Sequence, residues 1–337
     1  MDEKLNVTTV NRPARVEFVD LAKGITIMIM VMYHTGVGEP FYGAYSMIMI
    51  PVFYVTSGMF FKDYGGLKAF IVNRFHRLIV PFLTFYIGSY VLFYILKLLA
   101  PQLQTGTSTG ILDVSKQRLW FDFPIWFMLA LFVASIIFAA IHATLKKEAW
   151  RVAAVIAAGA AGVALGKFHI FVPCYLDCSL TAVPFYYCGF LLQKTPLTGE
   201  WKHDRFNIPA AIALYAAAVG LHILGQKPRI EFMGNGMIGF VALFAVTSVA
   251  AVVSLLLLCK AIKRLPVVNY LGRYSVVTLG MHLIIYRPVN LIMAWLGIES
   301  AILGAVATIL LCLACVPLFI RFLPFLFGRK TVQQPRG

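Results

Sequence analysis

Two ionisable residues, Lys23 and His34, interrupt a segment that is otherwise almost entirely apolar. On a helix their spacing places the imidazole about 16 Å deeper than the ammonium group. Titratable side chains are costly inside a bilayer and mark function there. Imidazole is a common general base, so the pair predicts a base at membrane depth with a cation nearer the surface. A merely hydrogen-bonded histidine and a lysine that reaches lipid phosphates are the plain alternatives.

A second basic pair, Arg74 and Arg77, opens a later apolar segment. Residues three positions apart share one face of a helix. Guanidinium groups bind phosphate through paired hydrogen bonds, and a helix N-terminus favours anions. The pair therefore predicts an anchor for a phosphorylated cofactor. Ordinary anchoring at the basic side of a membrane is the alternative.

The elements that must position these residues are membrane helices. Of the 337 residues, 60% are apolar and only 13% are charged, and the mean hydropathy is +0.83. Apolar runs long enough to cross a hydrocarbon core of about 30 Å recur along the chain. Their continuous hydrophobicity lacks the alternation of a membrane barrel, so the backbone must be helical. The sequence predicts an all-α, polytopic integral membrane bundle.

Ten membrane helices are predicted, joined by short loops, with a cytoplasmic N-terminal tail over 1–19, a transmembrane domain over 20–325 and a cytoplasmic C-terminal tail over 326–337. The helices are expected at 20–38, 46–61, 78–100, 124–145, 150–167, 180–193, 207–224, 237–259, 268–289 and 299–325. No soluble catalytic domain is evident, so any chemistry must occur within the bundle or at its rim.

The distribution of basic residues predicts that both termini are cytoplasmic. The chain carries 29 Lys and Arg residues and a net charge of +15, and most of these cations fall on the side of the N-terminus when the ten helices are threaded. The outer side keeps only Lys97, Lys116, Arg118, Lys167, Lys227, Arg229 and Arg287. The charge therefore reflects topology in a lipid bilayer, and we expect no nucleic-acid partner.

The order and spacing of several motifs resemble the membrane-bound acyltransferase family three, which O-acylates cell-surface glycans. The matching residues are Val19-Asp20-Leu21-Ala22-Lys23-Gly24-Ile25 with His34, then Ser57-Gly58, Arg74-x-x-Arg77 before Pro81, Trp126 to Phe132, Pro184 to Gly189, and Gly272-Arg273-Tyr274-Ser275 through His282. The resemblance runs nearly end to end. It departs at Lys23, where the family usually has arginine, which keeps the charge and loses the planar fork.

The resemblance implies transfer of an acyl group, most often from acetyl-CoA in the cytoplasm, to a glycan hydroxyl at the membrane or its outer face. His34 would deprotonate the acceptor or carry the acyl group transiently. Arg74 and Arg77 would hold the CoA phosphates, Lys23 would contact CoA or position a partner of His34, and Asp20 would balance the local positive charge. A thioester is already activated, so no metal is expected.

Four further positions are candidate substrate-binding residues. Ser57 or Trp126 would donate to the oxyanion, and Trp126 would alternatively stack on a sugar or belong to an interfacial aromatic belt. Asp177 is expected near the outer face, as a carboxylate for the acceptor or as a solvated loop residue. His282 is expected toward the outer end of the ninth helix, where it would contact the acceptor or cap the helix.

Two non-enzymatic functions remain open from the sequence. A transporter or flippase for a glycan or organic anion would also be a helical bundle with buried cations, and it would move its substrate without acyl-CoA. A glycan-sensing or assembly protein would tolerate the loss of His34. The expected location is the plasma membrane, as in the inner membrane of a bacterium; the glycan, the acyl chain and the oligomeric state are left open.

Overall fold

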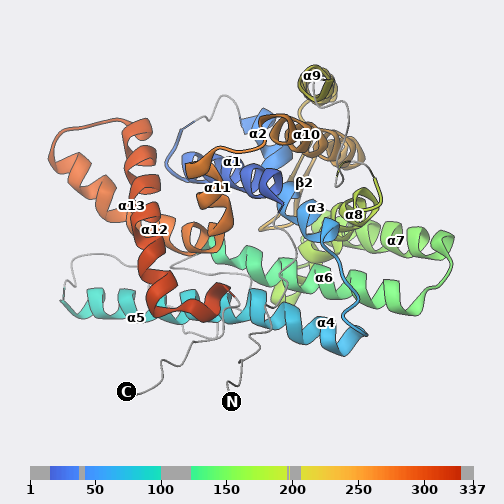
Figure 1. Ribbon diagram of the computed structural model, residues 1–337, viewed down its shortest axis with the longest axis horizontal. Helices are drawn as coiled ribbons and strands as arrows, with labels where there is room; N and C mark the ends of the chain where they lie inside the picture. The colour runs from blue at the N-terminus through green and yellow to red at the C-terminus, as the bar shows by residue number, and fades with distance from the viewer. Residues whose placement is uncertain (1–15, 38–41, 100–122, 196, 198–205, 328–337) are drawn as a thin grey trace, which may run out of the picture.

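The computed structural model describes residues 16–37, 42–99, 123–195, 197 and 206–327. Within these ranges the chain is almost entirely helical, with one short β-hairpin (Figure 1). The predicted outer-side cations Lys116 and Arg118, most of the longest predicted loop and most of both predicted tails lie outside the described residues.

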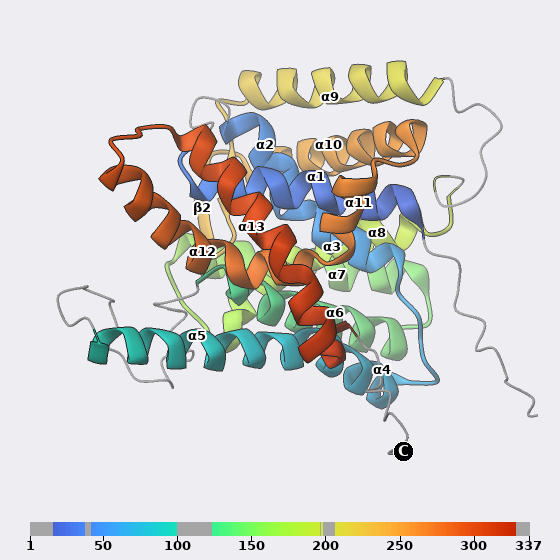
Figure 2. The ribbon, with the colours of Figure 1, turned by 60° about the vertical axis from the view of Figure 1, so that its left-hand side comes forward.

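The described residues form a succession of helices. They are α1 (Glu17–His34), α2 (Tyr42–Met49), α3 (Pro51–Met59), α4 (Leu67–Arg74), a π-helical turn (Phe75–Ile79), α5 (Val80–Leu99), α6 (Trp126–Thr144), α7 (Glu148–Lys167), α8 (Leu176–Leu192), α9 (Asn207–Leu224), α10 (Val241–Ile262), α11 (Pro266–Arg273), α12 (Ser275–Trp295) and α13 (Ala301–Phe322). Short 3₁₀ turns occur at Phe123–Ile125, Pro173–Tyr175 and Pro324–Phe327. Figure 2 shows α9, α10, α1 and α5 running in similar directions across the molecule, with α13 crossing them obliquely.

Seven helical segments of the described chain are long and apolar enough to cross a membrane. They are Leu67–Ile95, Trp126–Thr144, Glu148–Lys167, Asn207–Leu224, Val241–Ile262, Ser275–Trp295 and Ala301–Phe322. The prediction of an α-helical, multi-pass membrane protein is confirmed. The count of ten helices is not, and the cytoplasmic placement of the termini stays a prediction.

Two of the predicted helices are each divided into two. The segment predicted over 46–61 is broken at Ile50 into α2 and α3, because Pro51 opens α3 and has no backbone N–H with which to continue the hydrogen bonding of α2. The segment predicted over 268–289 is α11 and α12, broken at Tyr274, whose φ of −114° and ψ of 26° leave the helical region. Continuous hydrophobicity gives no sign of such changes in direction.

The helix predicted from residue 237 begins four residues later, and the segment before it forms an antiparallel hairpin that was not predicted. Its strands are β1 (Arg229–Glu231) and β2 (Gly236–Ile238). The buried Asn235 holds the turn against two helices: its Nδ2 donates to the carbonyl of Gly162 in α7 over 2.8 Å, and its Oδ1 accepts from Thr181 in α8 over 2.9 Å. These bonds fix the hairpin to the helical bundle.

In the described chain, two pairs of helices pack through glycines on both helices, at a distance where only glycine fits. A Cβ atom added to Gly24 of α1 or to Gly272 of α11 would overlap the backbone of the partner helix. Gly58 of α3 and Gly189 of α8 make the same reciprocal contact. Small residues let membrane helices pack backbone against backbone. Each pair therefore holds its two helices at a fixed distance.

The contact between α3 and α8 gives a direct test of this packing. We expect Gly189→Ala to destabilise the protein by about 1–3 kcal/mol, because the added methyl group meets the carbonyl of Val55, which cannot move without shifting α3. The thermal midpoint in detergent is the measurement. Gly220→Ala in α9 is the control, since a Cβ there meets no atom within 4 Å; equal midpoints for the two variants would contradict the packing argument.

Candidate active site

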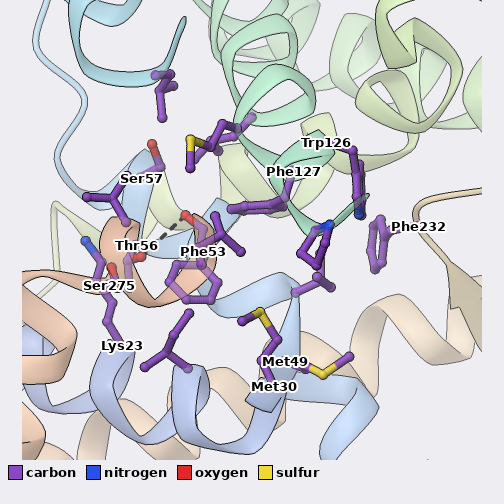
Figure 3. Close-up of a pocket in the computed structure, with 18 of the residues that line it drawn as sticks. Lys23, Met30, Met49, Phe53, Thr56, Ser57, Trp126, Phe127, Phe232 and Ser275 are labelled. Atoms are coloured by element: carbon purple, nitrogen blue, oxygen red, sulfur yellow. Dashed lines mark hydrogen bonds between the residues drawn. The ribbon is translucent and has the colours of Figure 1, made fainter. Parts of the chain in front are cut away.

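A cavity of about 780 Å³ lies between α1, α3, α6, α12, the π-helical turn and the hairpin. It brings together six of the residues predicted from the sequence, namely Lys23, His34, Ser57, Arg74, Arg77 and Trp126. Figure 3 shows Lys23 reaching from α1 into this cavity, on the side that Thr56, Ser57 and Ser275 also line.

The face that α1 presents to the cavity follows from helical spacing. Lys23, Ile27, Met30 and His34 recur every three or four residues and all line the cavity. The two ionisable groups therefore lie at the ends of one stripe, with apolar side chains between them. A stripe with cations at one end and an imidazole at the other suits a ligand whose charged and reactive parts are well separated.

The opposite face of α1 is held by α11. Arg273 Nη2 lies 3.4 Å from Glu17 Oε1, and Arg273 Nε lies 3.8 Å from Asp20 Oδ2. Asn269 Nδ2 also donates to the carbonyl of Glu17 over 2.8 Å. Asp20 is only 8% exposed and is not among the residues that line the cavity. In this structure Asp20 balances the charge of Arg273 and aligns α1, which directs Lys23 the other way.

His34 is the last residue of α1, although the helix was predicted to continue to residue 38. Gly36 has a φ of 83°, a left-handed conformation that glycine adopts without strain. The amide of Gly36 donates to the carbonyl of Tyr33 over 3.1 Å, and that of Val37 donates to Met32 over 2.9 Å. These two bonds form a Schellman motif, which ends the helix. The imidazole is thereby placed at a helix end that faces the cavity.

Arg74 joins three helices at the edge of the cavity. Its Nη1 donates to Ser57 Oγ over 3.1 Å, and its Nη2 donates to Tyr186 Oη over 2.9 Å. The guanidinium group also lies 5.2 Å from the ring centre of Phe70. Arg74 Nε is buried and has no hydrogen-bond partner in the described part of the chain. Arg74 therefore supports α3 and α8 and still presents cationic charge to a ligand.

The prediction that Arg74 and Arg77 open a helix is wrong. The helix begins at Leu67, after Gly66 with its φ of 127°, and continues through the π-helical turn into α5. The amide dipoles of a helix N-terminus thus do not contribute at these arginines. Both side chains line the cavity nevertheless. Arg77 is exposed and makes no hydrogen bond or ion pair with another residue of the described chain.

Trp126 is part of the cavity wall. It is only 6% exposed, and its ring centre lies 5.4 Å from that of Tyr175. A ring buried against other aromatics does not belong to an interfacial belt, so this alternative is disfavoured. Figure 3 shows Trp126, Phe127 and Phe232 gathered on the side of the cavity away from Lys23.

The hairpin contributes a part of the cavity that the sequence did not predict. Glu231, Phe232, Met233 and Gly234 line it. The available signal was the dipeptide Asn235-Gly236 between two short apolar segments, a pattern typical of a β-hairpin turn. In Figure 2 the hairpin strand β2 and the arginine-bearing α4 lie toward opposite ends of the bundle. The cavity thus has a cationic end and an end with aromatic rings and one carboxylate.

Asp177 lies away from this cavity. It is 0% exposed and sits in the first turn of α8, which begins at Leu176 and not at residue 180 as predicted. The alternative of a solvated loop residue is wrong, because the 3₁₀ turn at Pro173–Tyr175 leads the chain into the helix earlier. The alternative of a carboxylate for the acceptor stays a prediction. Asp177 is not a cavity-lining residue.

His282 also lies outside the cavity wall, but directly beside it. It is 0% exposed in the interior of α12, so it neither caps that helix nor reaches its outer end. Its ring centre lies 5.1 Å from that of His34. The contact joins two residues that are far apart in the sequence. Among the residues that the structure describes, no group of three His, Cys, Asp or Glu side chains is arranged to hold a metal ion.

Comparison with known families agrees with this arrangement. The model of a family described as an acyltransferase domain, acyltransferase family 3, matches residues 16–320. The match includes α1 through most of α13 and every residue of the cavity. Neither the curated proteins nor the solved structures gave a match. Because the family model covers most of the chain and the helices are those of a membrane protein, the chain belongs to acyltransferase family 3 and is a membrane acyltransferase.

Proposed function

We propose that the protein moves an acyl group, most often acetyl, from cytoplasmic acyl-CoA to a hydroxyl of a cell-envelope or exported glycan, in the plasma membrane of a bacterium. The observation that carries this proposal is the single cavity that contains both His34 and the guanidinium groups of Arg74 and Arg77. The base and the phosphate-binding groups can therefore act on one ligand.

The cationic end of the cavity is the proposed site of the acyl donor. Acyl-CoA carries its phosphates at one end and its thioester at the other. Lys23 and His34 are about 16 Å apart along α1, too far to act on the same reacting atom. We assign Lys23, Arg74 and Arg77 to the phosphates and the adjoining part of CoA, and His34 to the thioester. Charge-assisted hydrogen bonds to phosphate favour this orientation over the reverse.

The transfer itself needs one base and no metal. His34 takes the proton of the acceptor hydroxyl while the hydroxyl oxygen attacks the thioester carbonyl carbon. The carbon–sulfur bond then breaks, and the proton on His34 passes to the departing sulfur. A nucleophilic role for His34, with an acyl-imidazole formed first, uses the same geometry. Both routes require the imidazole to face the cavity, as it does.

The other end of the cavity is the proposed entrance for the glycan. Trp126 and Phe232 offer aromatic surfaces, and Glu231 offers a carboxylate that accepts hydrogen bonds from hydroxyl groups. Sugar rings present both a C–H face and hydroxyl groups, so they suit this lining. Donor and acceptor would then reach His34 from opposite ends.

The role of His34 is tested by His34→Ala. We expect a loss of transfer by at least about 100-fold, because the hydroxyl proton has no acceptor. The measurements are the mass of the surface glycan in cells, where one acyl mass should disappear, and acyl transfer from labelled acetyl-CoA by protein in lipid nanodiscs. His76→Ala, in the exposed part of the π-helical turn, is the control. Normal acylation by well-expressed His34→Ala would refute the proposal, and glycan movement without acyl-CoA would indicate a transporter.

The donor site is tested by Arg77→Gln, because within the described chain Arg77 makes no hydrogen bond or ion pair that supports the fold. We expect the KM for acyl-CoA to rise about 10-fold or more, as for the loss of a hydrogen bond to a charged group. At saturating acyl-CoA the kcat should change little. Steady-state kinetics with each substrate varied is the measurement.

Arg321→Gln is the matched control for the donor site, since Arg321 lies over Phe322 at the end of α13 and does not line the cavity. It should leave both KM values unchanged. A rise in the KM for the glycan with an unchanged KM for acyl-CoA would show that Arg77 has been assigned to the wrong substrate.

A further inference from the structure

The protonation of His282 can be read from its hydrogen bonds. Its Nδ1 lies 2.9 Å from the carbonyl oxygen of Thr278 and 3.0 Å from that of Leu279. Carbonyl oxygens only accept hydrogen bonds, so Nδ1 must carry a proton and donate it. In the neutral imidazole the other ring nitrogen, Nε2, then has a lone pair and is an acceptor.

This acceptor is buried without a donor. His282 is 0% exposed, and within the described chain its Nε2 has no hydrogen-bond partner. A buried polar atom without a partner costs free energy and calls for an explanation. In the described chain His142 and His222 also have a buried ring nitrogen without a hydrogen-bond partner, and neither is a cavity residue. His282 differs because its ring contacts a histidine that lines the cavity.

The neighbouring elements keep the two histidine rings together. The ring planes of His34 and His282 are inclined by 38°, with the centres 5.1 Å apart. One turn further along α12, Tyr286 Oη donates to the carbonyl of Thr35, the residue after His34, over 3.4 Å. His34 lines the cavity and His282 does not. His282 therefore lies beside His34 and outside the cavity wall.

We propose that His282 is a positioning residue for His34: Nε2 of His282 accepts a hydrogen bond from a ring N–H of His34, which turns the other, unprotonated nitrogen of His34 toward the acceptor hydroxyl. This inference rests on the proposed function. Ring centres 5.1 Å apart are compatible with a hydrogen bond between two ring nitrogen atoms that face each other. Orientation of a base by a third group is the general logic of activated nucleophiles.

The proton balance is simple in this arrangement. The proton of the acceptor hydroxyl moves to the free nitrogen of His34. The other nitrogen of the resulting imidazolium donates a hydrogen bond to Nε2 of His282 and keeps its proton. The proton taken from the hydroxyl later passes to the departing sulfur and leaves with the thiol of CoA. His282 keeps its own proton on Nδ1 throughout. Enzymes in water often use a carboxylate for this role, but a permanently charged group is costly at membrane depth. A neutral histidine provides the acceptor without that cost.

The test compares variants that keep or remove the acceptor at this position. His282→Leu should lower kcat on the order of 100-fold while the KM for acyl-CoA stays unchanged, because only the orientation of the base is lost. His282→Gln, whose amide oxygen reaches the place of Nε2, should recover at least about tenfold of that loss. His222→Leu, which removes a buried imidazole elsewhere, should retain the kcat of the parent protein.

Folding is checked on the same samples by size-exclusion chromatography and thermal unfolding. If His282→Leu does not fold, His282→Met replaces it, because Met and Gln are similar in length and only Gln offers an oxygen acceptor. A folded Leu or Met variant with the parent kcat would overturn the inference, and so would a variant in which only the KM for the glycan rises. Retained transfer in His34→Ala would instead refute the proposed function, so the two failures are distinguishable.

Discussion

The close contact between α1 and α11 determines where Lys23 and the two neighbouring histidines lie. Gly24 and Gly272 allow the two backbones to touch, and the ion pairs of Arg273 with Glu17 and Asp20 set the rotation of α1. The stripe from Lys23 to His34 must then face the cavity. Because α12 follows α11 after a single residue, the same contact also brings its interior histidine to the end of α1.

The second glycine contact supports the other half of the site. Gly58 and Gly189 hold α3 against α8, and these helices supply Ser57 and Tyr186, the two hydrogen-bond partners of Arg74. The position of Arg74 thus depends on a contact between two glycines and on two uncharged hydrogen-bond partners. Motif residues that resemble catalytic signatures in the sequence therefore have two separate roles: some set distances between helices, and others line the cavity.

The sequence predicted the class of protein and the placement of Lys23 and His34 along the first helix. It did not predict the contacts between distant segments. Hydrophobicity and the spacing of Lys23 and His34 are local properties, and both agree with the structure. The breaks at Ile50 and Tyr274 leave the apolar pattern unchanged, so hydrophobicity does not reveal them, although Pro51 marks the first. The burial of Asp177 and the pairing of the two histidine rings depend on helices that are remote in the chain, and no local pattern encodes such a pairing.

The π-helical turn between α4 and α5 has a consequence for how this region is compared among related chains. Upstream, Arg74 fixes α4 to α3 and α8; downstream, Phe85 of α5 packs against Gly280 of α12. A π-helical turn accommodates one more residue than an α-helical turn, so it changes the helical phase between these two anchorages. Counting helical periodicity straight through Phe75–Ile79 would therefore put the two halves of this span out of phase and assign lipid-facing positions to the interior.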